Sequence, residues 1–187
     1  MRLSNHNPVT AVAAFIHCMN YVCSICGETH SDLPHIGTKA PYYWTDALVG
    51  DPDSLLTEDL CIIEGRDYFV RGVIEVPVHD HEPGFGWGVW VSHKRENFEA
   101  YRSNFDARKI GPFFGWLSTA IAYYAEPTLN LKSMAHYRGD GLRPAIVLDE
   151  SDHPLCRHQR EGISLEEAWR MVHHYSQGSG LDNESVG

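Results

Sequence analysis

The stretch from residue 60 to residue 78 constrains the fold more than any other part of the sequence. Residues 60–63 (LCII) and 68–78 (YFVRGVIEVPV) are rich in β-branched and aromatic side chains, which favour strands. The polar connector at 64–67 (EGRD) contains the glycine that suits a tight hairpin turn. These residues predict two antiparallel strands joined by a short turn.

The longer of these strands alternates between two faces. Val70, Ile74 and Val76 share one face, which is expected to be buried. The opposite face mixes apolar with charged side chains, namely Phe69, Arg71, Val73 and Glu75. A mixed face of this kind would suit the lining of a groove.

The remaining pattern predicts an α+β fold with a mainly antiparallel sheet and C-terminal helices. Strand-forming residues recur at 86–91, 128–137 and 144–148, and helical patterns occupy 94–105 and begin near Pro154 and at Ser164. The aromatic run at 113–117 (FFGWL) is expected to form a turn packed on the core. Gly86 and Gly88 would weaken their strand unless another group approaches its backbone closely.

The length of 187 residues suits one domain with one core. Met19 looks like the natural start of that domain. We therefore expect an N-terminal extension at 1–18, a single domain at 19–177, and a flexible tail at 178–187, where the residues are small and polar.

The charge balance bears on partners and location. Asp and Glu number 25 against 15 Lys and Arg, so the formal net charge is −10. This argues against nonspecific nucleic-acid binding, which depends on basic side chains, and favours a protein partner with a basic surface. No apolar run approaches the roughly 18–20 residues that span a bilayer. We expect a cytoplasmic protein without a membrane partner.

The segment CSICGETH suggests a metal site of the zinc-knuckle type. Cys23 and Cys26 lie three residues apart, a glycine follows, and His30 is close enough to supply a third ligand. A fourth ligand would come from Cys18, Cys61 or His136. The five cysteines are an odd number, which fits free thiols or ligands better than a disulfide framework. A redox pair and a simple packed turn remain alternatives.

Two further groups of side chains are candidates. His136 and Arg138 share one face of their strand and could bind an anion. Trp87 and Trp90 point to opposite faces of another strand, so one of them could join such a pocket. His173 and His174 are adjacent on the last helix and point about 100° apart, so they cannot face one ion together. Both are expected to be surface residues.

Several segments together resemble a bacterial family known as domain of unknown function 2199. They are CSICGETHSDLP (23–34), LCIIEGRDYFVRGVIEVPV (60–78), FGWGVWVS (85–92), FFGWL (113–117), TLNLKSMAHYR (128–138) and DHPLCRHQREGIS (152–164). The resemblance runs in order over roughly residues 19–175. It implies that the CxxC-Gly-x-x-His segment is typical of the group, and it brings no activity, substrate or catalytic residue.

Two classes of function follow. The favoured one is a binding or regulatory protein with a structural zinc knuckle, for which a toxin-neutralising role would fit. The other is a small metal-dependent hydrolase with an open zinc site. In that case Cys23, Cys26 and His30 or His136 would hold the ion, and Glu28 would be the nearest candidate base. Whether the protein is an enzyme stays open at this point.

Overall fold

The structure is a computed structural model that describes residues 20–105 and 110–176. The extension expected at 1–18 and the tail expected at 178–187 lie outside the described residues. The strands are β1 (Tyr21–Val22), β2 (Thr29–His30), β3 (Ile36–Gly37), β4 (Leu55–Leu56), β5 (Leu60–Ile63), β6 (Asp67–Val78), β7 (His81–His93), β8 (Phe113–Leu117), β9 (Lys132–His136) and β10 (Ala145–Leu148). The helices are η1 (Asp46–Leu48), α1 (Arg95–Ser103), α2 (Pro154–Glu161) and α3 (Leu165–Ser176). This content confirms the α+β class.

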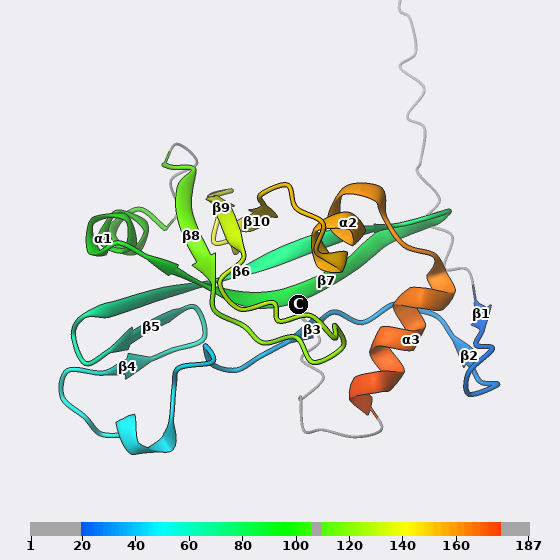
Figure 1. Cartoon of the computed structure of the whole chain (residues 1–187), viewed down its shortest axis with the longest axis horizontal. Helices are drawn as coiled ribbons and strands as arrows, with labels where there is room; N and C mark the ends of the chain where they lie inside the picture. Colours follow the sequence, from blue (N-terminus) through cyan, green and yellow to red (C-terminus); the bar gives the residue numbers. More distant parts are fainter. Residues whose placement is uncertain (1–19, 106–109, 177–187) are drawn as a thin grey trace, which may run out of the picture.

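The sheet closes on itself into a five-stranded barrel and is mixed, so the expectation of a mainly antiparallel sheet holds only in part. Strands β6 to β10 follow one another as antiparallel neighbours, and β10 then returns to pair with β6 in parallel, with Ala145 opposite Val73. A meander of five strands has its first and last strands pointing the same way, so closure makes this pair parallel. Outside the barrel, β5 and β4 extend from β6, and β3 adds in parallel to β7 (Figure 1).

A glycine permits this closure. A Cβ atom at Gly72 would lie 2.6 Å from the side chain of Ile146 and 2.8 Å from the backbone oxygen of Pro144. Beyond Ala145 the two strands separate, and the side chain of Gln159 in α2 bonds to the edge of β10 in place of β6. Its amide nitrogen donates to the oxygen of Ile146 at 2.6 Å, and its oxygen accepts from the nitrogen of Leu148 at 2.8 Å.

The aromatic run at 113–117 is strand β8, so the expectation of a turn was wrong. Its residues alternate in exposure, with Gly115 and Leu117 buried and Phe114 and Trp116 each 41% exposed. That alternation has the period of a strand. The aromatic side chains of Phe114 and Trp116 obscured it because aromatic residues are expected inside.

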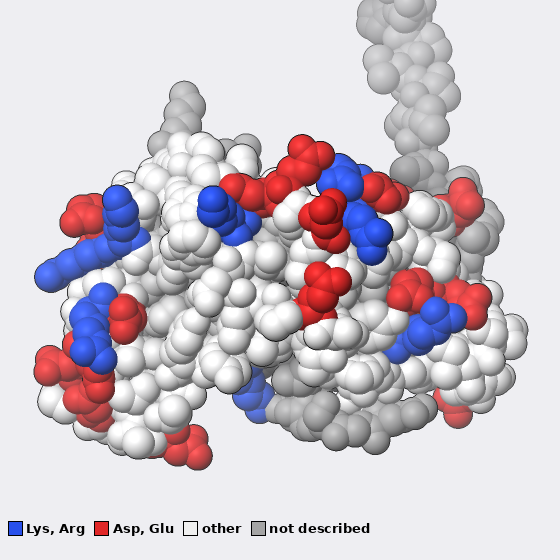
Figure 2. Space-filling model, viewed as in Figure 1, with Lys and Arg blue, Asp and Glu red and all other residues white. Residues whose placement is uncertain are grey.

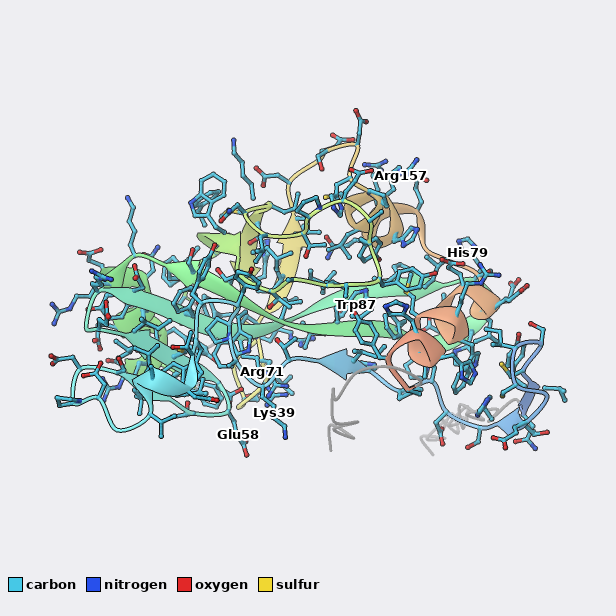
Figure 3. The ribbon with its side chains drawn as sticks, turned by 60° about the horizontal axis from the view of Figure 1, so that its bottom comes forward. Lys39, Glu58, Arg71, His79, Trp87 and Arg157 are labelled. Atoms are coloured by element: carbon cyan, nitrogen blue, oxygen red, sulfur yellow. The ribbon has the colours of Figure 1, made fainter. Side chains whose placement is uncertain are left out.

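The two faces of β6 pack against different partners, as the alternation predicted. Val70, Ile74 and Val76 are buried in the main core. Phe69 lies in a second cluster with Cys61 and Trp90, and the buried Arg71 reaches the backbone oxygen of Glu58 (Figure 3).

The glycines of β7 are also explained by close neighbours. A Cβ atom at Gly86 would lie 2.6 Å from the ring of His35, and one at Gly88 would lie 3.1 Å from the Cα atom of Gly37. The approach of other groups to this backbone is therefore confirmed.

Helices α2 and α3 begin where the sequence predicted. The ring of His153 caps α2 by accepting from the nitrogen of Leu155, and Ser164 caps α3 by accepting from the nitrogen of Glu167. Helix α3 lies between the barrel and the β1–β2 hairpin (Figure 1), and Trp87 of β7 points toward it (Figure 3). Over the described residues, no helix has the length and apolar character to cross a membrane.

Candidate metal centre

The CSICGETH segment forms a small hairpin of its own. Strands β1 and β2 pair in antiparallel, with Tyr21 opposite His30. The nitrogen of Cys23 donates to the oxygen of Glu28, and the nitrogen of Gly27 donates to the oxygen of Cys23, both at 2.8 Å. Gly27 has a φ of +75°, which glycine adopts without cost. The tight turn thereby brings the two cysteines and the histidine to the same side.

Four potential ligands converge at this turn. The sulfur of Cys26 lies 3.3 Å from Nε2 of His30, and the sulfur of Cys23 lies 3.3 Å from Nε2 of His173 in α3. The four ligand atoms all lie within 4.8 Å of one another. One ion could therefore contact all four. Within residues 20–105 and 110–176, this is the only set of three or more Cys, His, Asp or Glu side chains so arranged.

The backbone of the turn favours a thiolate at Cys23. Burial of this thiol acts to raise its pKa, but hydrogen bonds from the backbone nitrogens of Cys26 and Ile25, and from the Cys26 side chain, outweigh burial and lower the pKa. Thiolate is the form that binds metal ions. Backbone N–H groups directed at sulfur would also hold the ligand in place once an ion is bound.

Aromatic stacking attaches the hairpin to α3. The ring of His30 stacks on Trp169, with ring centroids 3.9 Å apart and planes 18° apart, and Tyr21 stacks on the same indole at 6.4 Å. His173 follows Trp169 by four residues, so both side chains lie on one face of the helix. The face that packs on the hairpin is thus also the face that supplies the fourth ligand atom.

The expectation that His173 is a surface residue was therefore wrong. It is partly buried and 150 residues from Cys23 in the chain, yet the two side chains meet. The prediction that the two adjacent histidines cannot share an ion is confirmed, because His174 is exposed and packs against Tyr123. Its spacing of four residues from Trp169 places His173 beside the apolar stripe of α3, but the sequence does not indicate which element that stripe packs against.

The other proposed ligands lie apart from this cluster. Cys61 is fully buried beside Phe69 and Trp90, and burial raises the pKa of its thiol to about 12. His136 is exposed at the end of β9. Cys18 lies outside the described residues.

The pocket residues suggested by the sequence are dispersed as well. Arg138 pairs with Glu75 at 2.6 Å. Trp87 is buried in the main core, whereas Trp90 is buried in the second cluster on the opposite face of β7. The structure does not bring these tryptophans together with His136 and Arg138 around one cavity.

Comparison with known proteins agrees with the sequence resemblance. The profile of one family matches residues 22–163, which is more than half of the chain. The chain belongs to the DUF2199 family. This family is described as uncharacterized protein conserved in bacteria. Neither the curated proteins nor the solved structures contain a match to the chain. The DUF2199 match includes Cys23, Cys26 and His30, whereas His173 lies beyond it.

Proposed function

We propose that this DUF2199 protein binds one structural zinc ion through Cys23, Cys26, His30 and His173. The observation that carries the proposal is the convergence of these four ligand atoms within 4.8 Å. With zinc–sulfur bonds near 2.3 Å and zinc–nitrogen bonds near 2.0–2.1 Å, the ligand atoms of a tetrahedral site are about 3.3–3.8 Å apart. The two contacts of 3.3 Å join sulfur to nitrogen, and they lie within about 0.3 Å of the roughly 3.5 Å expected for such a pair. Two sulfur and two nitrogen ligands in a tetrahedron are typical of zinc.

The charge of the site supports the same assignment. Two thiolates and two neutral imidazoles carry a charge of −2, which a divalent zinc ion neutralises. A neutral site is compatible with the burial of Cys23, whereas an unpaired buried thiolate would be costly. A set of four protein ligands leaves no coordination position for a substrate, as in structural zinc sites.

The ion would act as a clamp between the two ends of the described chain. Strands β1 and β2 have two residues each and form a sheet separate from the barrel. A hairpin of this size is not stable alone in water. Ligands from the hairpin and from α3 on one ion would hold the hairpin against the helix.

For the protein as a whole, we favour a cytoplasmic binding or regulatory role with a basic protein partner. The net charge of −10 and the closed ligand set support this role, and a toxin-neutralising function is compatible with it. The exposure of Cys26 is the one feature that favours the alternative, a hydrolase with an open zinc site, because water can reach this edge of the cluster.

The decisive experiment combines elemental analysis of the untagged full chain with a count of reactive thiols before and after chelation. We expect about one zinc ion per chain, with chelation exposing two further thiols. A chain without metal, in which chelation exposes no further thiols, would refute the zinc site. Capture of partners from a lysate of the native bacterium tests the binding role. A panel of ester, amide and phosphate substrates tests the alternative, which metal-dependent hydrolysis of any of them would favour.

A further inference from the structure

The barrel opens into a groove where its last strand leaves its first. We call this hollow the seam groove. It has a volume of about 850 Å³ and lies between β6 and β10, with the end of the β6–β7 hairpin and α2 as its other walls. Its floor is apolar. The buried side chains of Val76, Phe85, Ile146 and Leu148 form its base, and the exposed apolar side chains of Pro77, Pro83 and Val147 line it above them.

The rim of the seam groove is acidic. Four exposed carboxylates line it, namely Glu75, Glu82, Asp149 and Glu150, against one guanidinium, Arg160. Figure 2 shows this mixture as acidic and basic side chains beside one another over α2.

Two of these carboxylates form no ion pair with the described residues. Glu75 pairs with Arg138 at 2.6 Å, and Glu150 lies 3.6 Å from Arg160. Among the described residues, no ion pair involves Glu82 or Asp149. They come from different walls of the groove, one from the start of β7 and one just after β10. A cationic group over the groove would meet negative charge from both sides.

The backbone of β10 limits how an occupant can bind. A partner strand would normally pair with the free edge of a sheet, but the side chain of Gln159 already bonds the oxygen of Ile146 and the nitrogen of Leu148. Recognition must therefore rely on apolar side chains at the floor and on charge at the rim.

We propose that the seam groove binds an extended basic segment of a partner protein, with apolar side chains on the floor and lysine or arginine side chains at Glu82 and Asp149. This inference rests on the protein-binding role proposed above and names the chemistry of the partner. Charge complementarity at such a rim mainly determines specificity and the rate of association.

The test uses the full chain as purified and a fluorescent heptapeptide that alternates lysine with leucine. We expect saturable binding by fluorescence polarisation that weakens as salt is raised. The double variant E82Q/D149N should weaken binding between about twofold and thirtyfold, since each exposed ion pair contributes modestly. The double variant D46N/E96Q removes the same charge from exposed sites on η1 and α1 and should bind like the unmodified chain.

Peptides of altered composition separate the two parts of the recognition. A lysine–serine peptide should bind more weakly because it leaves the apolar floor empty, and a glutamate–leucine peptide should not bind. The proposal would be overturned if E82Q/D149N bound the lysine–leucine peptide as tightly as the unmodified chain does. It would also be overturned if the unmodified chain bound the glutamate–leucine peptide, or spermidine, as tightly as it binds the lysine–leucine peptide. Amide NMR shifts centred away from residues 145–150 on peptide binding would also overturn it.

The lysate experiment distinguishes this failure from failure of the broader role. A partner captured equally by the unmodified chain and by E82Q/D149N would leave the protein-binding role standing and overturn the assignment of the groove. Absence of both a captured partner and peptide binding would overturn both.

Discussion

Replacing His173 by alanine tests the metal centre most directly. His173→Ala removes one proposed ligand from α3 without altering the CxxC hairpin. The adjacent change His174→Ala is the matched control, because it removes the same side chain from the same helix. His174 is exposed and packs on Tyr123, whereas Nε2 of His173 lies 3.3 Å from the sulfur of Cys23.

The expected magnitude follows from the number of ligands. Structural zinc sites contribute about 10–16 kcal/mol of binding free energy at neutral pH. An equal share for each of four ligands is about 2.5–4 kcal/mol, which weakens zinc binding by about two to three orders of magnitude. The ring of His173 lies 5.7 Å from that of His30 and 5.9 Å from that of Trp169. The closer stack of His30 on Trp169, at 3.9 Å, should survive the substitution, so the fold should be retained.

Competition with a chromogenic zinc chelator measures the affinity, and thermal unfolding with and without chelator measures the linked stability. We expect chelation to lower the Tm of the unmodified chain and of His174→Ala alike, and to have a smaller effect on His173→Ala. Equal zinc affinity in the two variants would refute the ligand set derived from the structure.

Four further changes probe the fold and the turn. Gly72→Ala should lower the free energy of unfolding by about 1–3 kcal/mol, because the new Cβ atom would lie 2.6 Å from the Ile146 side chain. Urea unfolding with an unchanged m-value measures this loss. A loss below about 0.5 kcal/mol would contradict the role of Gly72 in closure. Gln159→Leu should lower the free energy of unfolding by about 2–4 kcal/mol in the same assay, because two backbone groups of β10 lose their hydrogen-bond partner. An unchanged free energy of unfolding would mean that water replaces the amide. Gly27→Ala should cost about 1–2 kcal/mol through its φ of +75° and should weaken zinc binding in the chelator assay; unchanged affinity would show that the turn adapts. Burial lowers the pKa of His93 in the folded state, so the unfolded chain binds more protons and the free energy of unfolding falls as pH drops below about 6.5. His93→Phe should reduce the fall in stability between about pH 7.5 and 5.5. An unchanged fall would show that other groups cause it.

The strands and the helix starts of this protein could be predicted because each depends on residues that lie close together in the chain. The alternation in 68–78 places Val70, Ile74 and Val76 in the core. Helices α2 and α3 begin near Pro154 and Ser164 as expected, with caps from His153 and Ser164. The strand at 113–117 was missed because its exposed positions carry Phe114 and Trp116, which mimic buried residues.

The candidate metal centre also has one part that the sequence could predict and one part that it could not. Cys23, Cys26 and His30 lie within eight residues, so the geometry of one tight turn brings them together and spacing alone could propose them as a set. His173 could not be selected, because a helix histidine beside an apolar stripe looks the same whether it faces solvent or a distant hairpin.

The sequence by itself therefore determined the alternation of the strands, the helix caps and the three clustered ligands, since each depends on contacts within one element or turn. The tertiary structure alone decided that β10 closes the barrel against Gly72, that Gln159 bonds to the edge of β10 beside the seam groove, and that His173 joins the cluster of potential ligands. These features join residues far apart in the chain, and their positions depend on how all the intervening elements pack.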